Sequence, residues 1–261
     1  MICILSDFGI ESIYIAEMIG VIKSINPKAE VVILKNNITR HNIIEGSFII
    51  NEVSKYFPPG TIFLCIVDPT VGSSRPSIIL VTKRNIYVGP DNGLFYYVAK
   101  NEGIHSIYRI EISKIFNNIS MTFHGRDIFA KVAAMLDIGF RPDFFGTLVN
   151  YITESEIEKP LIINESVLGK IIYIDDFGNL ITNISKNDLI KANLATVSQL
   201  KVNINNAEYK LPFVRTYSEV SVGSPLILIN SFNLVELAVN QGDARNFFKA
   251  NVNDRLQLSR T

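Results

Sequence analysis

The chain has 261 residues, enough for one large domain or two modest ones. Hydrophobic residues make up 48% of it, and Lys plus Arg balance Asp plus Glu at 25 each. A chain without net charge has no field that steers it toward nucleic acid or an anionic membrane surface, so we expect as partner a small molecule or another copy of the chain.

Cysteine use and the N-terminus indicate the compartment. Cys3 and Cys65 lie in apolar, strand-like segments and are too few for a disulfide framework, which favours a reducing environment. They also lack the ligand spacing of a metal site, so no metal is expected. The first residues have no basic segment of a signal peptide, and no apolar run approaches the roughly 18–20 residues of a membrane helix. We therefore expect a soluble, cytoplasmic protein.

The first half of the chain alternates strands and helices. Apolar residues recur at helical spacing from Ile13 to Ile25, and the run from Thr61 to Val67 is continuously apolar, as in a strand covered on both faces. The expected order is a strand at 1–5, a helix at 13–25, a strand at 31–34, a helix at 43–56, strands at 61–67, 78–81 and 86–88, and a helix at 128–136. This order predicts an α/β domain with a central, mostly parallel sheet between helices.

The pattern changes after Pro142. Short strands separated by polar or glycine turns follow at 170–174, 180–184, 199–204, 207–211, 225–229 and 235–239, with one helical turn at 186–191. Such a pattern predicts a smaller all-β domain that resembles a barrel or a sandwich. A charged stretch with a proline, from Glu154 to Pro160, separates the two halves, so the expected domains are residues 1–158 and 167–261.

Candidate site residues follow the strands of the first half. Ligands bind beyond the carboxyl ends of the strands in open α/β sheets. Asp7 follows the first strand, where a carboxylate either binds a ribose diol or only caps the next helix. Asp68 and Arg75 lie in a glycine-containing turn after the most buried strand, and taken alone they are more simply explained as an ion pair that closes the loop.

Other polar motifs are equally ambiguous when each is taken alone. His124 precedes a glycine at a helix entrance, where an imidazole either faces a cleft or has a structural role, the commoner case. The turns Asp175–Asn179 and Asn230–Asn233 also fit ordinary hairpins. No GxGxxG, GxxxxGK[ST], HExxH or GxSxG motif occurs, which disfavours a nicotinamide dehydrogenase, a P-loop NTPase, a zincin and an α/β-hydrolase.

Nine short motifs follow one another along nearly the whole chain: Ser6–Gly9, Ser24–Pro27, Glu45-Gly46, Tyr56–Thr61, Val67–Gly72, Gly89–Gly93, Phe123–Asp127, Asp176–Asn179 and Asn230–Phe232. Taken together and in order, these motifs resemble one family, the S-adenosyl-L-methionine (SAM) hydroxide adenosyltransferases, or SAM hydrolases, which are related to SAM-dependent fluorinases and chlorinases.

The resemblance implies an enzyme that hydrolyses SAM to adenosine and L-methionine by attack of an activated water on ribose C5′, with SAM as substrate and no cofactor. It also implies a homotrimer, with each site between one subunit's N-terminal domain and its neighbour's C-terminal domain. The family's water-activating trio maps onto Asp68, Arg75 and His124. The halogenases resemble this scaffold but carry a tyrosine in place of Asp68 and an extra loop, which argues for water as the nucleophile here.

Substrate-binding roles are also implied by the resemblance. Asp7 would hold the ribose diol, and Phe123 would line the same pocket. The remaining positions come from the second half of the chain and are Asp175, Asp176, Phe177, Asn179 and Ser231.

Two departures from the family affect affinity more than chemistry. Ser12 stands where an acid is usual, and Arg40-His41 lies in a segment that is usually of Pro-Pro-Gln type. The main alternative is a non-catalytic protein that binds SAM or adenosine. Retention of all three members of the trio argues against it, because binding alone does not need a group that activates water.

Overall fold

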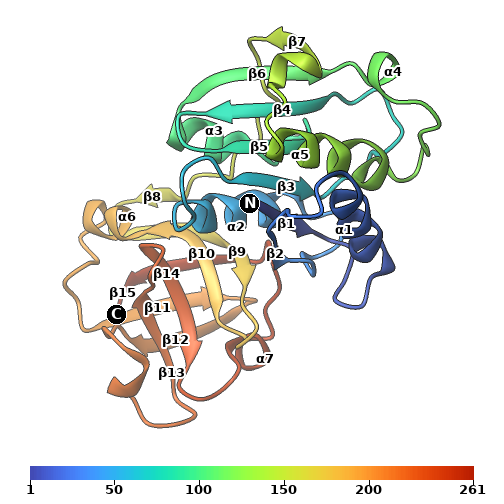
Figure 1. Cartoon of the computed structure of the whole chain (residues 1–261). Helices are drawn as coiled ribbons and strands as arrows, with labels where there is room; N and C mark the ends of the chain where they lie inside the picture. The colour runs from blue at the N-terminus through green and yellow to red at the C-terminus, as the bar shows by residue number, and fades with distance from the viewer. The chain divides into compact units, whose positions relative to one another are not determined.

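A computed structural model of the chain describes residues 1–261, which divide into two compact units, Met1–Glu156 and Ile157–Thr261. Figure 1 labels the helices and strands of both units. Each unit has its own hydrophobic core. No helix in either unit has the length and apolar character needed to cross a membrane.

The N-terminal unit is a sheet covered by helices on both faces. Its elements are β1 Ile2–Ser6, α1 Ile13–Ile25, β2 Val31–Lys35, α2 Ile43–Ser54, β3 Ile62–Ile66, β4 Ser77–Thr82, β5 Ile86–Pro90, α3 Tyr96–Glu102, β6 Ile104–Ile110, α4 Ile112–Ile115, the π-helical turn η1 Gly125–Phe129, α5 Ala130–Asp137, the 3-10 turn η2 Pro142–Phe144 and β7 Gly146–Val149.

The N-terminal sheet has seven strands in the order β2-β1-β3-β5-β4-β6-β7. The strands β2, β1, β3 and β5 are parallel to one another, whereas β4 and β7 run in the opposite direction. The expected mostly parallel sheet is therefore confirmed, but the sheet is mixed, which the sequence analysis did not predict. The reason is the short turn from Lys83 to Asn85, because three residues cannot form the crossover that parallel strands need.

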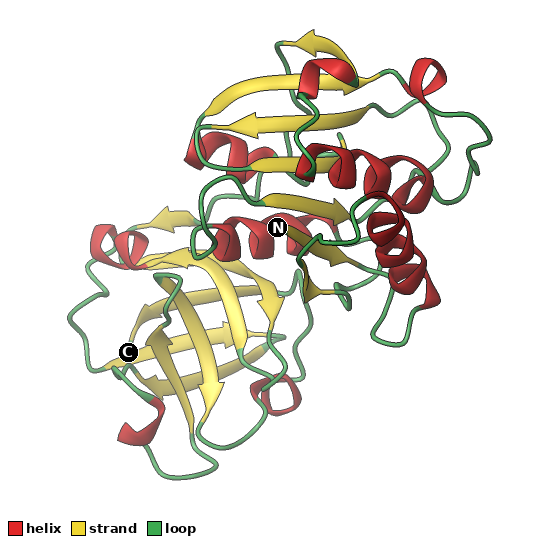
Figure 2. Cartoon of the chain, in the orientation of Figure 1, coloured by secondary structure: helices red, strands yellow, loops and turns green.

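Side chains alternate between the two faces of this sheet. Ile2 and Ile4 of β1 lie in the core that α1 and α5 cover, whereas the neighbouring Leu5 lies close to Gly46 of α2 on the opposite face. Figure 2 shows the helices on both sides of the strands. Because β1, β3 and β5 are parallel, their carboxyl ends meet at one edge of the sheet and present the loops that follow them together.

The C-terminal unit is almost entirely β-structure. Its elements are β8 Leu161–Ile163, β9 Ser166–Ile174, β10 Leu180–Ser185, α6 Lys186–Lys191, β11 Gln199–Ile204, β12 Ala207–Pro212, the 3-10 turn η3 Tyr217–Glu219, β13 Pro225–Ile229, β14 Leu234–Val239, α7 Ala244–Phe248 and β15 Arg255–Arg260.

The C-terminal sheet is antiparallel throughout and nearly closed. Its strands follow the order β12-β11-β15-β9-β10-β14-β13, and β8 pairs with β9. Phe213, directly after β12, forms a bridge to Ile227 of β13, so the two edges of the sheet approach each other. The predicted all-β domain is confirmed, and its form is close to a barrel.

Candidate active site

A pocket of about 290 Å³ lies at the carboxyl edge of the parallel strands in the N-terminal unit. It lies where the loops after β1 and β3 meet the segment that leads into η1. Its lining residues are Asp7, Phe8, Tyr14, Arg40, His41, Ile66, Asp68, Val71, Thr122, Phe123, His124 and Gly125.

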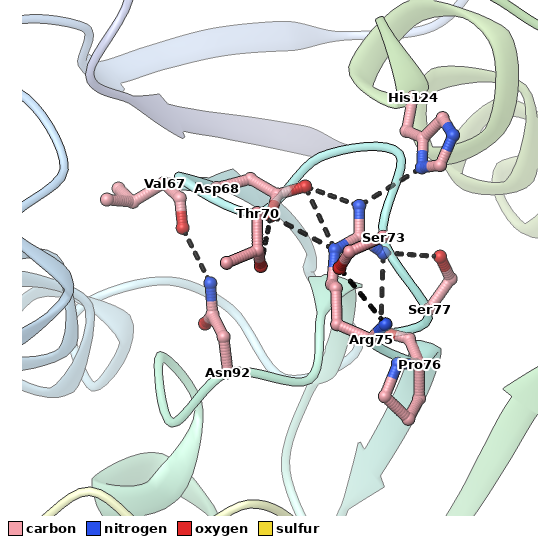
Figure 3. A network of polar contacts seen from close by, with 9 residues as sticks. All are labelled: Val67, Asp68, Thr70, Ser73, Arg75, Pro76, Ser77, Asn92 and His124. Carbon is pink, nitrogen blue, oxygen red and sulfur yellow. Dashed lines mark hydrogen bonds and ion pairs between the residues drawn. The ribbon is translucent and has the colours of Figure 1, made fainter. Parts of the chain in front are cut away.

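The loop after β3 carries Asp68 and Arg75 and folds back on itself. The Arg75 guanidinium binds the Asp68 carboxylate through Nε, at 3.0 and 3.1 Å from the two oxygens, and through Nη2 (Figure 3). Gly72, at φ +81°, allows the turn, and a Cβ there would overlap the carbonyl oxygen of Met121. The loop therefore packs directly against the segment that leads to His124.

His124 completes a buried trio with this ion pair. Its Nδ1 lies 3.1 Å from Arg75 Nη2, and the side chains of Arg75 and Asp68 are only 8% and 4% exposed. Burial lowers the pKa of His124, the positive charge of Arg75 lowers it further, and the charges of Asp68 and Asp127 act in the opposite direction. A neutral imidazole is therefore favoured at neutral pH. The structure brings together all three residues of the sequence-predicted trio.

The π-helical turn η1 holds His124 at the pocket. His124 is the residue before η1, and Asp127 within that turn accepts a hydrogen bond from the Ser120 backbone N–H at 2.9 Å. Arg126 binds Asp127 and also reaches Glu17 of α1 at 2.7 Å. Hydrogen bonds from Arg126 lower the pKa of Asp127, so it stays ionised. Such π turns occur often at functional sites.

Asp7 lies in the same pocket and does not cap α1. The cap is Ser12, whose hydroxyl oxygen accepts a hydrogen bond from Tyr14 N–H, so the capping alternative for Asp7 is wrong. One oxygen of Asp7 accepts a hydrogen bond at 2.8 Å from the backbone N–H of His41. His41 adopts a left-handed φ of +65°, which is uncommon for a residue with a side chain and is often found at binding sites.

Three aromatic rings form the apolar wall of the pocket. Phe8, Tyr14 and Phe123 contact one another edge to face, with ring centroids 4.9 to 5.8 Å apart. The sequence indicates Phe123 but not Tyr14, because a tyrosine in the first turn of a helix gives no sign by itself that it faces a ligand. Arg40, which also lines the pocket, was noted only as a departure from the family pattern.

The remaining predicted residues lie in two turns of the C-terminal unit. Asp175 accepts hydrogen bonds from the backbone N–H groups of Phe177 and Asn179 and from the Asn179 side chain, so its carboxylate shapes the turn between β9 and β10. Asp176 and Phe177 are exposed, Phe177 to 79%. Ser231 is exposed in the turn between β13 and β14.

A buried acid that sequence analysis missed lies behind these turns. Glu236 of β14 is 3% exposed and accepts hydrogen bonds from Tyr217 Oη at 2.7 Å and from Asn230 Nδ2 at 3.2 Å. Burial raises its pKa, and the charge of Asp175 raises it further, against the lowering effect of the two hydrogen bonds. Its position in an apolar strand carries no motif that could have revealed it.

A second, larger cavity of about 510 Å³ lies in the C-terminal unit. Its charged side chains include Lys170 and Arg255, which both pair with Glu158, and it contains none of the predicted site residues. No group of three or more His, Cys, Asp or Glu side chains is placed to hold a metal ion. We therefore assign the candidate active site to the smaller pocket, which holds two members of the trio.

Comparison with known proteins points to one family. The models for the SAM hydroxide adenosyltransferase N-terminal and C-terminal domains match residues 2–146 and 169–257. The (R)-S-adenosyl-L-methionine hydrolase of Methanocaldococcus jannaschii is 32% identical over 99% of this chain and 95% of its own length. A fluorinase of an Actinoplanes species is 29% identical, over 92% of this chain and 91% of its own.

A solved structure shares the fold over the entire length of both chains. It is an uncharacterized conserved protein from Thermotoga maritima, with a TM-score of 0.93 and 35% identity over 100% of each chain.

Proposed function

The chain belongs to the SAM hydroxide adenosyltransferase family, and we propose from this premise that it hydrolyses SAM to adenosine and L-methionine. The observation that carries the proposal is the buried cluster of Asp68, Arg75 and His124 beside a pocket that also holds Asp7. A ligand-binding site alone has no need of such a cluster. The relative with a hydrolase name spans almost the whole of this chain, which supports the same activity.

The reaction is a substitution at ribose C5′. The sulfonium of SAM is a good leaving group, so the difficulty lies in the nucleophile, because free water has a pKa of about 15.7. An oxygen lone pair of water forms the C5′–O bond while the C5′–S bond breaks. The bonding electrons go to sulfur, which becomes the neutral thioether of methionine, and one proton leaves the attacking water. A buried pocket strengthens the electrostatic interactions that favour this step.

Water is the nucleophile that the residues favour. The resemblance places a tyrosine of the halogenases at the position of Asp68, and this chain has a carboxylate there, paired with Arg75. A carboxylate repels a halide ion and accepts a hydrogen bond from water. The fluorinase relative therefore indicates a shared scaffold, whereas the residue at position 68 separates the two activities.

We assign Asp7 to the ribose diol and Phe123 to the apolar wall of the pocket. Asp7 lines the pocket, and His41 N–H binds one of its oxygens, so the other oxygen is the one assigned to the ribose hydroxyls. SAM exists as two epimers at sulfur, and the R epimer appears in the name of the M. jannaschii relative. We assign the same epimer to this chain as its preferred substrate.

The C-terminal turns would complete the site from a neighbouring subunit of a homotrimer. The pocket of about 290 Å³ is at the lower limit of the roughly 300–1,000 Å³ typical of small-molecule sites, so a second surface is needed to enclose SAM. Phe177 has the exposure expected of a ring that packs on such a ligand, and Asp175, Asp176, Asn179 and Ser231 lie in the turns assigned to this surface. The two free, buried cysteines support a cytoplasmic location.

The test is product formation by purified protein with each SAM epimer. Adenosine and methionine should appear in equal amounts, and Asp68→Asn and His124→Ala should each lower kcat by about 100-fold or more. If SAM raises the melting temperature but stays intact, the protein is a binding protein and not an enzyme.

A further inference from the structure

All five N–H groups of Arg75 are occupied by protein acceptors. Nε binds the two oxygens of Asp68, and Nη1 binds the Pro76 carbonyl oxygen at 3.3 Å and Ser77 Oγ at 2.8 Å. Nη2 binds Asp68 Oδ2 and His124 Nδ1 (Figure 3). A guanidinium has five such donors and no acceptor. Arg75 therefore has no donor left for a water molecule.

The residues that line the pocket also indicate that Arg75 does not contact the attacking water. Asp68 and His124 line it, whereas Arg75 does not. Arg75 also lies over the ring of the fully buried Phe129, with its guanidinium carbon 5.3 Å from the ring centroid. The carboxylate and the imidazole therefore border the pocket, whereas the donors of the guanidinium that links them are bound to protein acceptors.

The contact with Arg75 also determines the tautomer of His124. Because arginine only donates, the ring nitrogen that faces it, Nδ1, must be the acceptor and carry no proton. The neutral ring then carries its proton on Nε2, which points away from Arg75 in Figure 3. His124 lines the pocket and its Nδ1 is taken by Arg75, so Nε2–H is the donor that the imidazole has left for a ligand or a water.

We propose that His124 is a hydrogen-bond donor to the attacking oxygen and not its base, that Asp68 takes the proton, and that Arg75 is a positioning residue that acts through both. This proposal rests on the proposed hydrolysis of SAM. The attacking water donates to the Asp68 carboxylate and accepts from His124 Nε2–H, so one lone pair is aimed at C5′.

Asp68 can accept the proton of the attacking water although its carboxylate is bound to Arg75. As the C5′–O bond forms and the C5′–S bond breaks, the attached water becomes a protonated alcohol, which is a strong acid. A carboxylate accepts its proton at that stage. The proton then passes from Asp68 to solvent, and adenosine leaves as the neutral alcohol. Neither an oxidant nor a metal enters the balance.

The tautomer can be measured without substrate. The chain has 3 histidines, so long-range 1H–15N correlation spectra of 15N-labelled protein at neutral pH can be assigned by the loss of one set of signals in His124→Gln. We expect a protonated Nε2 and an unprotonated Nδ1 for His124. A protonated Nδ1 would overturn the proposal. This result stands whether or not the protein turns over SAM.

Two amide substitutions separate a donor from a base. The glutamine amide in His124→Gln reaches the position of Nε2 and can donate there, whereas the shorter asparagine in His124→Asn reaches only that of Nδ1. We expect kcat of His124→Gln to fall by about tenfold or less and that of His124→Asn by about 100-fold or more. Equal, large losses in both variants, with melting temperatures unchanged, would identify His124 as a base and contradict the proposal. A wild-type protein that leaves SAM intact would instead refute the proposed function, and the spectra would still decide the tautomer.

Discussion

At the residue scale, the positive charge of Arg75 acts on two neighbours, Asp68 and His124. It binds the carboxylate of Asp68 directly, and it disfavours a second positive charge on His124 at 3.1 Å. A protonated His124 would place an N–H donor against the donors of Arg75 and break the contact. The neutral imidazole is thus the form that keeps the trio together.

We predict that kcat/KM falls as the pH is lowered and that the midpoint of this fall lies below pH 6.5. Burial and Arg75 lower the pKa of His124 from 6.5, so its neutral form persists to a lower pH than that of a free imidazole. As the pH falls through the lowered pKa, His124 gains a proton and the rate decreases. The measurement is a pH–rate profile of the wild type, and a midpoint above 6.5 would show that the groups near His124 do not act as described.

Residue-scale patterns in the sequence identified the polar groups but not their partners. Asp7 could equally have capped α1, and only the structure shows that Ser12 does so. The buried Glu236 and the pocket-lining Tyr14 were missed because a single acid or aromatic residue in an apolar pattern has no distinctive spacing. Tertiary contacts, which local patterns do not encode, decide such roles.

At the scale of elements, the site depends on the close approach of two loops. The loop after β3 and the segment that leads into η1 meet at Gly72, where the backbone of one lies against the carbonyl of the other. This contact brings the ion pair of Asp68 and Arg75 within reach of His124. A substitution that moves these two loops apart therefore changes the geometry of the trio, although none of its three residues is replaced.

We predict that Gly72→Ala lowers both the melting temperature and kcat more than Gly60→Ala does. The two glycines have similar φ values of +81° and +85°, so both substitutions carry the conformational cost of a left-handed residue, about 1–2 kcal/mol. A Cβ at Gly60 meets open space, whereas one at Gly72 overlaps the Met121 carbonyl. Thermal unfolding and kinetics of the pair measure the difference, and equal effects would mean that the loop contact is unimportant.

Helices and strands with a regular apolar pattern could be predicted from the sequence, and those without one could not. The helix expected at 13–25 is α1 with the same bounds, because its apolar face and its Asn-Pro end are both distinct. In contrast, β6 and β7 were not predicted, since their exposed positions interrupt any alternation, and the antiparallel half of the sheet was missed with them. The π turn η1 was missed because it follows from local tertiary contacts and not from sequence spacing.

At the scale of the whole molecule, the proposed trimer divides each site between two chains. The proposed catalytic cluster belongs to the N-terminal unit, and the exposed Phe177 belongs to the C-terminal unit. A mass three times the chain mass of 29.2 kDa is expected in solution. The arrangement also predicts that defects in the two units can compensate for each other between chains.

We predict that mixing Asp68→Asn with Phe177→Asp restores activity that neither variant has alone. In a mixed trimer, some sites combine an intact N-terminal unit from one chain with an intact C-terminal unit from its neighbour. The measurement is SAM hydrolysis after the two variants are unfolded and refolded together, with separately refolded samples as the control. Activity that stays at the level of the separate variants would place both halves of each site in one chain.

The most direct measurement of the central claim is SAM hydrolysis in water labelled with oxygen-18. Attack of water on C5′ predicts that the label enters the 5′-hydroxyl of adenosine and that methionine is unlabelled, with both products lost in Asp68→Asn. Mass spectrometry of the two products reads the result. Cleavage on the methionine side of sulfur, which would leave methylthioadenosine and no labelled adenosine, or intact SAM, would contradict the account.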